Sequence, residues 1–337
     1  MLVIGADSLW TNRNNLDVGQ EGPDNQLSIA DGGSVVASGV VVGRVSAATG
    51  SLVAVSGGNL QAVGPAGSGS LEVRHGLLSL NGGSVATDQL ILTNAGGQMS
   101  FNAGTLSARG SALANTFAFT IGDGAQGATM NLLGGAHGFS DGLVINTNAT
   151  VSGWGTVSAA IANYGVLSAS NGVMQLEGGA VTGTGGVVLV RPGAQLDAAG
   201  DVGSVASVVT NELGGVFKNT GGQITFLDVF VNNGKYISDS GTNFFTTLQV
   251  GASGALIGGP GDEFVIQGNL INASTNAFTF DLAGTALGFG IGSHTFEFAG
   301  ADLGLDWSGY SNNFAIGELE IAPGGTVTIE DGNTGND

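Results

Sequence analysis

The chain has 337 residues, of which 63 are glycine, 5 are proline and none is cysteine. Glycine does not recur at every third position, which excludes collagen, and the 42% of hydrophobic residues gives the chain a core to bury, which excludes disorder. The net charge of −19 disfavours nucleic-acid backbones and anionic membranes as partners, because both bear charge of the same sign.

Helix is not expected. Lys and Arg total only 7, and apolar residues at helical spacing are interrupted by glycine throughout. Charged residues make up 10% of the chain, so its surface must consist mainly of Ser, Thr, Asn, Gln and Gly, which is typical of an extended β surface. The composition therefore predicts an all-β protein.

The ends and the missing cysteines bear on location. The start MLVIG has no basic segment followed by a long apolar one, so we expect no signal peptide and a chain that is trimmed relative to its precursor. The sequence contains no run of about 18 apolar residues, the length needed to span a bilayer. The lack of cysteine excludes disulfides and thiolate chemistry, and suits an exported protein that relies on hydrogen-bond ladders.

A short unit recurs along the chain: an alternating strand, then Gly-Gly or Asx-Gly, then a second alternating strand. Most copies begin about 21 to 31 residues after the previous one, as expected for a solenoid whose coils must stack to bury their apolar sides. Glycine suits the corners because it adopts positive φ without a steric penalty. The copies are residues 27–35 (LSIADGGSV), 52–60 (LVAVSGGNL), 78–85 (LSLNGGSV), 99–106 (MSFNAGTL), 130–135 (MNLLGG) and 174–181 (MQLEGGAV).

Composition changes near Gly214, after which 12 of the 16 phenylalanines lie. We therefore divide the chain into regular glycine-rich coils, residues 1–213, and a continuous Phe-rich part, residues 214–337, with wider coils or capping coils. Asparagine recurs at expected turns, and we favour solvent-facing turns over stacked internal amides for these residues. They are Asn146, Asn148, Asn163, Asn171, Asn211, Asn232, Asn233 and Asn269.

Several segments resemble the passenger repeats of autotransporter-like bacterial surface proteins. The similarity lies in residues 10–12 (WTN), 16–19 (LDVG), 27–33 (LSIADGG), 41–43 (VVG), 149–157 (ATVSGWGTV) and 163–169 (NYGVLSA). Residues 294–304, 312–319 and 327–333 look like the last coils of exported repeat proteins that carry a C-terminal Pro-Glu-Pro sorting signal. The resemblance implies a right-handed parallel β-helix, made by a single chain, at a bacterial cell surface or outside the cell. It supplies no catalytic residue.

Catalysis on a β-helix would need basic residues beside carboxylates. Stacked coils could align Arg44, Arg74 and Arg109, although solvated faces are the simpler interpretation for these residues and for Arg13, Arg191, Lys218 and Lys235. Arg74-His75 is the one basic pair, with Glu72 near it.

No metal site is expected from the three histidines, His75, His137 and His294. The carboxylates at Asp239, Asp262-Glu263, Asp302 and Asp306 cluster weakly, which leaves Ca²⁺ a minor possibility and gives no cofactor.

Residues 122–127 (GDGAQG) lack the Gly-Lys-Ser/Thr of a phosphate loop. Trp10, Trp154, Trp307, Tyr164, Tyr236 and Tyr310 are expected to fill or cap the core, and a sugar-stacking platform is the alternative. We thus expect no catalytic, cofactor or metal residue and a non-catalytic structural or adhesive module that binds surface glycans or its own copies end to end. A β-helix polysaccharide lyase or hydrolase is the alternative.

Overall fold

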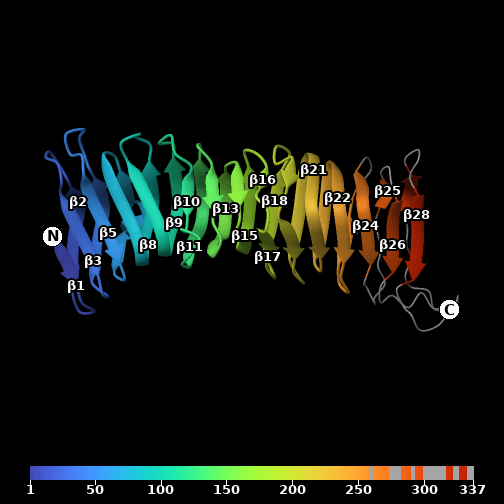
Figure 1. The fold of residues 1–337 in the computed structure, drawn as a ribbon, viewed down its shortest axis with the longest axis horizontal. Coiled ribbons are helices and arrows are strands. Elements are labelled where there is room, and N and C mark those ends of the chain that lie inside the picture. Colours follow the sequence, from blue (N-terminus) through green and yellow to red (C-terminus); the bar gives the residue numbers. More distant parts are fainter. Residues whose placement is uncertain (259–261, 273–281, 290–292, 299–315, 322–325, 332–337) are drawn as a thin grey trace. The chain divides into compact units, whose positions relative to one another are not determined.

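A computed structural model describes residues 1–258, 262–272, 282–289, 293–298, 316–321 and 326–331, with side-chain surroundings up to residue 271. It divides into two compact units, Met1–Leu167 and Ser168–Asp337. In each unit, short strands pair in parallel with strands of the neighbouring coils (Figure 1). Each unit is thus a β-solenoid, which confirms the predicted fold class. Its handedness stays a prediction.

The first unit contains β1 to β14, and β15 crosses its boundary. The strands are β1 (Leu2–Ile4), β2 (Leu9–Val18), β3 (Gln26–Ala30), β4 (Ser34–Val42), β5 (Ser51–Ser56), β6 (Asn59–Ala62), β7 (Ser70–Val73), β8 (Gly76–Leu92), β9 (Gln98–Leu113), β10 (Phe119–Ile121), β11 (Ala128–Phe139), β12 (Leu143–Ile145), β13 (Ala149–Ser158), β14 (Ile161–Asn163) and β15 (Val166–Glu177), with one 3-10 turn, Pro65–Gly67.

The second unit continues with β16 (Val181–Thr182), β17 (Val187–Val190), β18 (Gln195–Ala199), β19 (Ser204–Val205), β20 (Val208–Asn211), β21 (Val216–Asn232), β22 (Lys235–Val250), β23 (Ala255–Ile257), β24 (Glu263–Asn272), β25 (Leu282–Phe289), β26 (Ser293–Phe298), β27 (Ile316–Ile321) and β28 (Thr326–Asp331). Apart from the short turn in the first unit, all the regular structure described here is strand.

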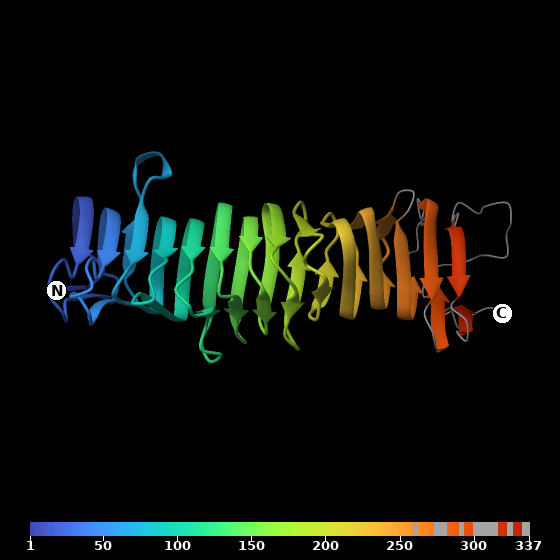
Figure 2. The same cartoon turned by 90° about the horizontal axis from the view of Figure 1, so that it is seen from above.

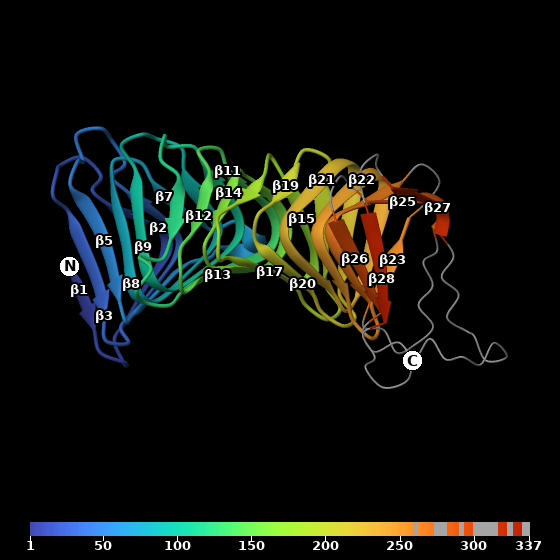
Figure 3. The same cartoon turned by 45° about the vertical axis from the view of Figure 1, so that its right-hand side comes forward.

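Each coil of the first unit has three straight segments, which Figure 3 shows obliquely around a common interior. In β8 they are residues 76–80, 84–87 and 89–92, and each pairs with matching segments of the coils before and after it. Gln26 pairs with Leu52 and Leu52 with Leu77, so these coils take 26 and 25 residues, within the spacing that the repeats predict.

Glycine makes the corner between the first two segments of β8. Gly82 and Gly83 have φ of +143° and +79°, a region that residues with a Cβ rarely adopt. A Cβ on Gly83 would also overlap the carbonyl oxygen of Gly58 in the preceding coil. The predicted glycine corner therefore has two causes, the backbone conformation and the close approach of the next coil.

Side chains point alternately inward and outward along each strand, so every second side chain lies inside its coil. An interior row of the first unit runs through paired positions of successive coils and is aliphatic except for Phe101. Its members are Ile29, Val55, Leu80, Phe101, Ile121 and Ile145, each at most 2% exposed. Paired side chains in stacked coils thus form a continuous apolar core.

The core of the second unit contains an aromatic stack, consisting of Phe217, Phe226, Phe230, Tyr236, Phe245 and Phe264. Phe217 lies parallel to Tyr236 with ring centroids 5.4 Å apart, and Phe226 meets Phe230 edge to face at 4.7 Å. These residues belong to the Phe-rich part predicted from residue 214. Its coil width and its capping role stay predictions, and the side chains of its last six phenylalanines lie outside the described residues.

The prediction of solvent-facing asparagine turns is wrong for three residues. Asn163, Asn211 and Asn232 are fully buried. Asn211 and Asn232 are paired positions of adjacent coils, and Asn211 Nδ2 donates to Asn232 Oδ1 over 2.8 Å. Asn232 Nδ2 donates in turn to the Ala255 carbonyl at 2.8 Å. Stacking thus supplies partners for the Asn211 NH2 group and for both ends of the Asn232 amide. Asn148 lies in an exposed turn as predicted, whereas Asn171 and Asn269 are exposed but belong to β15 and β24.

Candidate functional site

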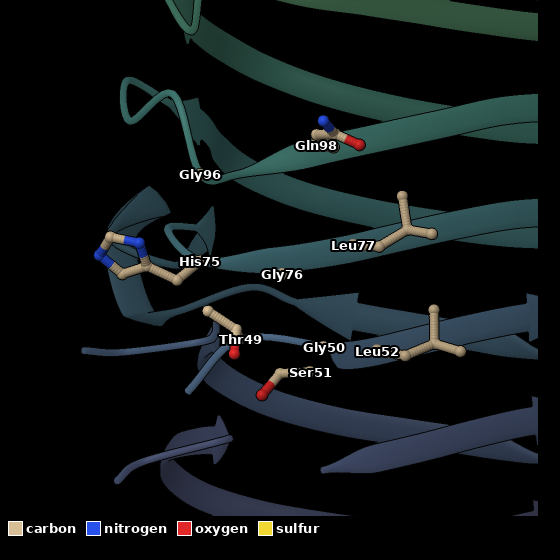
Figure 4. Close-up of a pocket in the computed structure, with 9 residues that line it drawn as sticks. All are labelled: Thr49, Gly50, Ser51, Leu52, His75, Gly76, Leu77, Gly96 and Gln98. Atoms are coloured by element: carbon tan, nitrogen blue, oxygen red, sulfur yellow. The ribbon is translucent and has the colours of Figure 1, made fainter. Parts of the chain in front are cut away.

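A groove follows the corner between the third segment of one coil and the first segment of the next, in the first unit. The connecting turns take eight residues at 43–50, two at 74–75 and five at 93–97. Because the shortest turn lies between two longer ones, the surface is hollowed above it. Figure 4 shows this hollow of about 400 Å³, with His75 at one end and Leu52, Leu77 and Gln98 along the strands.

Side chains and bare backbone share the lining of this hollow. Thr49, His75 and Gln98 provide a hydroxyl, an imidazole and an amide, while Leu52 and Leu77 provide aliphatic surface. Gly50, Gly76 and Gly96 expose backbone, and a Cβ on Gly96 would come within 2.7 Å of His75 Nδ1. Glycine at 96 therefore leaves room for the imidazole, which lies in a neutral, partly apolar depression.

A second hollow of about 280 Å³ adjoins Gln98 from the other side. Leu92, Met99 and Phe119 line it with Phe117, whose side chain is 53% exposed. The turn that carries Phe117 is fixed at two points: Asn115 Nδ2 donates to the Gly97 carbonyl at 2.7 Å, and the Thr116 N–H donates to Asp141 Oδ2 at 2.8 Å. Thr116 has φ of +73°, which is strained for a β-branched residue.

Of the three arginines that stacked coils could align, Arg44 and Arg74 come together. Arg44 Nη2 lies 2.6 Å from Asp17 Oδ1, and Arg74 Nη2 donates to Glu72 Oε2 at 2.8 Å. Asp17 and Glu72 are both paired with Val41, from opposite sides, so the two ion pairs lie on one face. Hydrogen bonding to Asp17 raises the pKa of Arg44, and hydrogen bonding to Glu72 raises that of Arg74.

Arg109 belongs to a different arrangement. Its Nε lies 3.1 Å from Oδ1 of the buried Asp88, whose Oδ2 accepts the backbone N–H groups of Gly64 and Gly69 at 3.0 and 2.8 Å. Asp88 thereby closes the neck of the loop between β6 and β7, the blue loop that projects from the first unit in Figure 2. The role of this ion pair is to hold a loop.

The histidines have unlike surroundings. His137 is fully buried, and its Nε2 lies 2.9 Å from the Gly134 carbonyl, which can only accept, so Nε2 carries the proton. Nδ1 then accepts from the Ser111 hydroxyl at 3.0 Å. Burial lowers the pKa of His137, against the opposing effect of the Gly134 carbonyl. Sequence reasoning missed this Ser–His pair, which lies inside the coil; the side chain of His294 is outside the described residues.

The carboxylates Asp239 and Asp262 have different surroundings in the structure. Asp239 lies 3.2 Å from Lys218 Nζ at the surface, while Asp262 is buried and accepts from Ser238 Oγ and from the Gly241 N–H. Within the described ranges no three His, Asp or Glu side chains are grouped so as to hold a metal ion. Asp302 and Asp306 lie outside those ranges.

The aromatic residues do not all share one role. Tyr236 is buried in the aromatic stack, as the core interpretation predicts, and its hydroxyl donates to Asn243 Oδ1 at 2.6 Å. Burial, with the charge of Asp262, raises the pKa of Tyr236. Tyr164 is 44% exposed, and Trp10 and Trp154 are partly exposed. Trp307 and Tyr310 lie outside the described residues.

The glycine-rich segment 122–127 is a turn closed by its own carboxylate. Asp123 Oδ1 accepts from the N–H groups of Ala125 and Gln126 at 2.8 and 3.1 Å. These bonds, that from Gln126 first, lower the pKa of Asp123. Two of the turn's N–H groups thus bind Asp123 within the turn itself.

No family model matches the chain, and no curated protein or solved structure is significantly similar to it. Among the residues that the structure describes, none forms a helix of the length and apolar character needed to cross a bilayer.

Proposed function

We propose that this chain is a non-catalytic structural or adhesive β-solenoid, displayed outside a bacterial cell or on its surface. One observation carries the proposal: each of the three arginines that stacked coils could align is paired with a carboxylate of the fold. Arg44 and Arg74 are each closed onto one carboxylate, and Arg109 braces a loop through Asp88. Location outside the cell is supported by the resemblance to autotransporter-like proteins and by the absence of cysteine from the sequence.

The test measures attachment and turnover on the same preparation. Beads that carry the purified chain are expected to adhere to bacterial cells or to extracted cell-surface polysaccharide, while the chain releases no sugar from a panel of polysaccharides. Beads that carry an unrelated protein of similar negative charge serve as the control. Sugar release that is lost on a single substitution would overturn the non-catalytic assignment.

A glycan lyase or hydrolase is the second candidate, and the Arg44–Arg74 face is the observation that favours it. Two arginines stand there beside two carboxylates, Asp17 and Glu72, each about one-fifth exposed. If this face is catalytic, turnover on a polysaccharide must fall in the Asp17→Asn and Glu72→Gln variants. A matched Glu212→Gln variant, which breaks the exposed pair with Arg191, must leave it unchanged.

Self-association is part of the proposal. Strands β1 and β2 carry Leu2 and Leu9, both more than half exposed. A strand edge with exposed apolar residues can add a strand of another copy. Sedimentation velocity should show larger species as concentration rises, and a Leu2→Lys, Leu9→Lys double variant should remain monomeric. Monomers alone at high concentration would remove self-association from the proposal.

A further inference from the structure

We propose that the two hollows that meet at Gln98 form one binding site for a neutral saccharide chain lying across the coils. The inference rests on the proposed adhesive function and names the class of ligand and the residues that would bind it. The site follows four successive turns, at residues 43–50, 74–75, 93–97 and 114–118. Three steps between coils span about 15 Å, enough for several sugar units.

The charge of the lining selects the ligand class. Neither hollow is lined by Asp, Glu, Lys or Arg, although the chain carries a net charge of −19. An anionic ligand would find no cationic partner in the lining, and a metal ion would find no carboxylate. The site is therefore suited to a neutral ligand.

The strands beneath the groove disfavour an extended peptide. β5 pairs with β3 and β8, and β8 pairs in turn with β9, so the backbone groups of β5 and β8 beneath the groove are already engaged on both sides. A peptide that binds by adding a strand needs a free edge. Recognition along β5 and β8 is therefore left to side chains, which include both apolar and hydrogen-bonding types.

A sugar chain has the matching chemistry. One face of a sugar ring presents C–H groups, which pack on an aromatic face, and its rim presents hydroxyls that both donate and accept. Phe117 offers the aromatic surface, and Leu52 and Leu77 offer aliphatic surface. The Gln98 amide, the His75 imidazole and the Thr49 hydroxyl each combine donor and acceptor capacity, as hydroxyl recognition requires.

Phe117 is held ready for a ligand. An exposed aromatic side chain gains little for folding, yet its turn is anchored by Asn115 and Asp141 and contains the strained Thr116. Backbone strain of this kind persists where the surrounding structure enforces it, commonly at binding sites. A fixed platform also lowers the entropy lost when a ligand binds.

The experiment is affinity electrophoresis of the full chain through gels that contain soluble polysaccharides. The panel is mixed-linkage β-glucan, xylan, mannan and dextran, with anionic polygalacturonate as the charged comparison. At least one neutral polymer should retard the chain. Phe117→Ala should weaken binding at least about tenfold, as expected for an aromatic anchor, and Gln98→Ala and His75→Ala should weaken it less. Tyr164→Ala is the matched control, another exposed aromatic residue of the same unit that lines neither hollow, and should bind like the unchanged chain.

Three results would overturn the inference: no neutral polymer retards the chain, polygalacturonate retards it most, or Phe117→Ala and Tyr164→Ala weaken binding equally. Circular dichroism is used to check that every variant is folded. The bead assay separates this inference from the proposed function. If beads carrying Phe117→Ala adhere as well as the unchanged chain, the groove is wrong and the adhesive function stands. If no beads adhere although the polymer is bound, the adhesive function is wrong.

Discussion

The two units fill similar parallel coils with different chemistry. In the first unit the interior row from Ile29 to Ile145 is largely aliphatic, and each side chain stacks on a similar one in the next coil. In the second unit Phe226 packs edge to face on Phe230 and parallel to Phe245. Parallel pairing thus fixes which positions meet, and side-chain shape decides how they pack.

Glycine forms corners in both units, but the second unit adds a network of buried amides beside them. At the β8 corner, Gly83 lets one coil approach the carbonyl of Gly58 directly. In the second unit a buried amide also reaches across: Asn243 accepts from Asn219 and Tyr236, and donates to Ser238. Glycine corners need no partner side chain, whereas amide corners depend on each member of a network.

Removing one aromatic ring should have the largest effect. We expect Phe226→Ala to lower the free energy of unfolding by about 3–5 kcal/mol, because it leaves a cavity among four neighbouring rings. Hydrogen exchange read by mass spectrometry should show lost protection in β21 and β22. Leu80→Ala is the matched change in the first unit and should expose β8 and β9 instead. Equal loss in both units for either variant would contradict the expectation that the effect is confined to the altered coils.

Breaking the amide network should have the second-largest effect on stability. Asn243→Leu keeps the size of the side chain but leaves the Tyr236 hydroxyl and other buried groups without a partner, at an expected cost of about 2–4 kcal/mol. Asn59→Leu is the control in the first unit, where the amide is partly exposed and bonds Ser84. Urea denaturation should show a change below about 1 kcal/mol for the control. Similar losses of stability for both variants would mean that the buried network adds nothing to the free energy of unfolding.

Glycine corners can be tested by two glycines of nearly equal φ. Gly83 and Gly221 have φ of +79° and +77°, but a Cβ would overlap the Gly58 carbonyl only at Gly83 and meets nothing within 4 Å at Gly221. Gly221→Ala should cost about 1–2 kcal/mol from backbone strain alone. Gly83→Ala should cost about 1–3 kcal/mol more, because the neighbouring coil must shift. Equal midpoints in urea would show that close approach between coils is unimportant.

The fold could be predicted because its causes are local. Alternation in residues 27–35 and glycine at residues 82–83 act within a few positions, and repetition of such units implies stacking. Burial of Asn211 could not be predicted in this way, because its partner Asn232 lies 21 residues away and is chosen by the register between coils. A row of asparagines at the coil spacing is the signal that could have favoured the internal ladder.

The residues of the candidate site could likewise be predicted only in part from the local sequence. Arg74 and His75 stand out in the sequence as one basic pair, but the structure turns Arg74 onto Glu72 and places His75 in the groove. The groove arises from the lengths of three turns, and no residue type marks it. Phe117 was not singled out, because its exposure depends on the anchors at Asn115 and Asp141.

The first unit also contains a buried polar pair, Ser111 and His137, although its interior row is largely aliphatic. The effect of this pair on the free energy of unfolding should be the smallest of those predicted here, and it should be confined to acidic pH. Burial places the pKa of folded His137 below the value of about 6.5 expected when unfolded. The unfolded chain therefore binds the proton first, so this contribution to stability is complete above about pH 6.5 and is lost as pH falls below it.

Urea denaturation between pH 7.5 and 4.5 should show a steeper loss of stability for the unchanged chain than for His137→Gln. The glutamine amide can donate to the Gly134 carbonyl and accept from Ser111 without titrating. Because the many carboxylates titrate in both proteins, the difference between the two curves isolates His137. Local hydrogen exchange in β11 should follow that difference. Parallel curves would show that the folded imidazole takes up a proton as readily as the unfolded one, and the interior of the first unit would then be open to solvent.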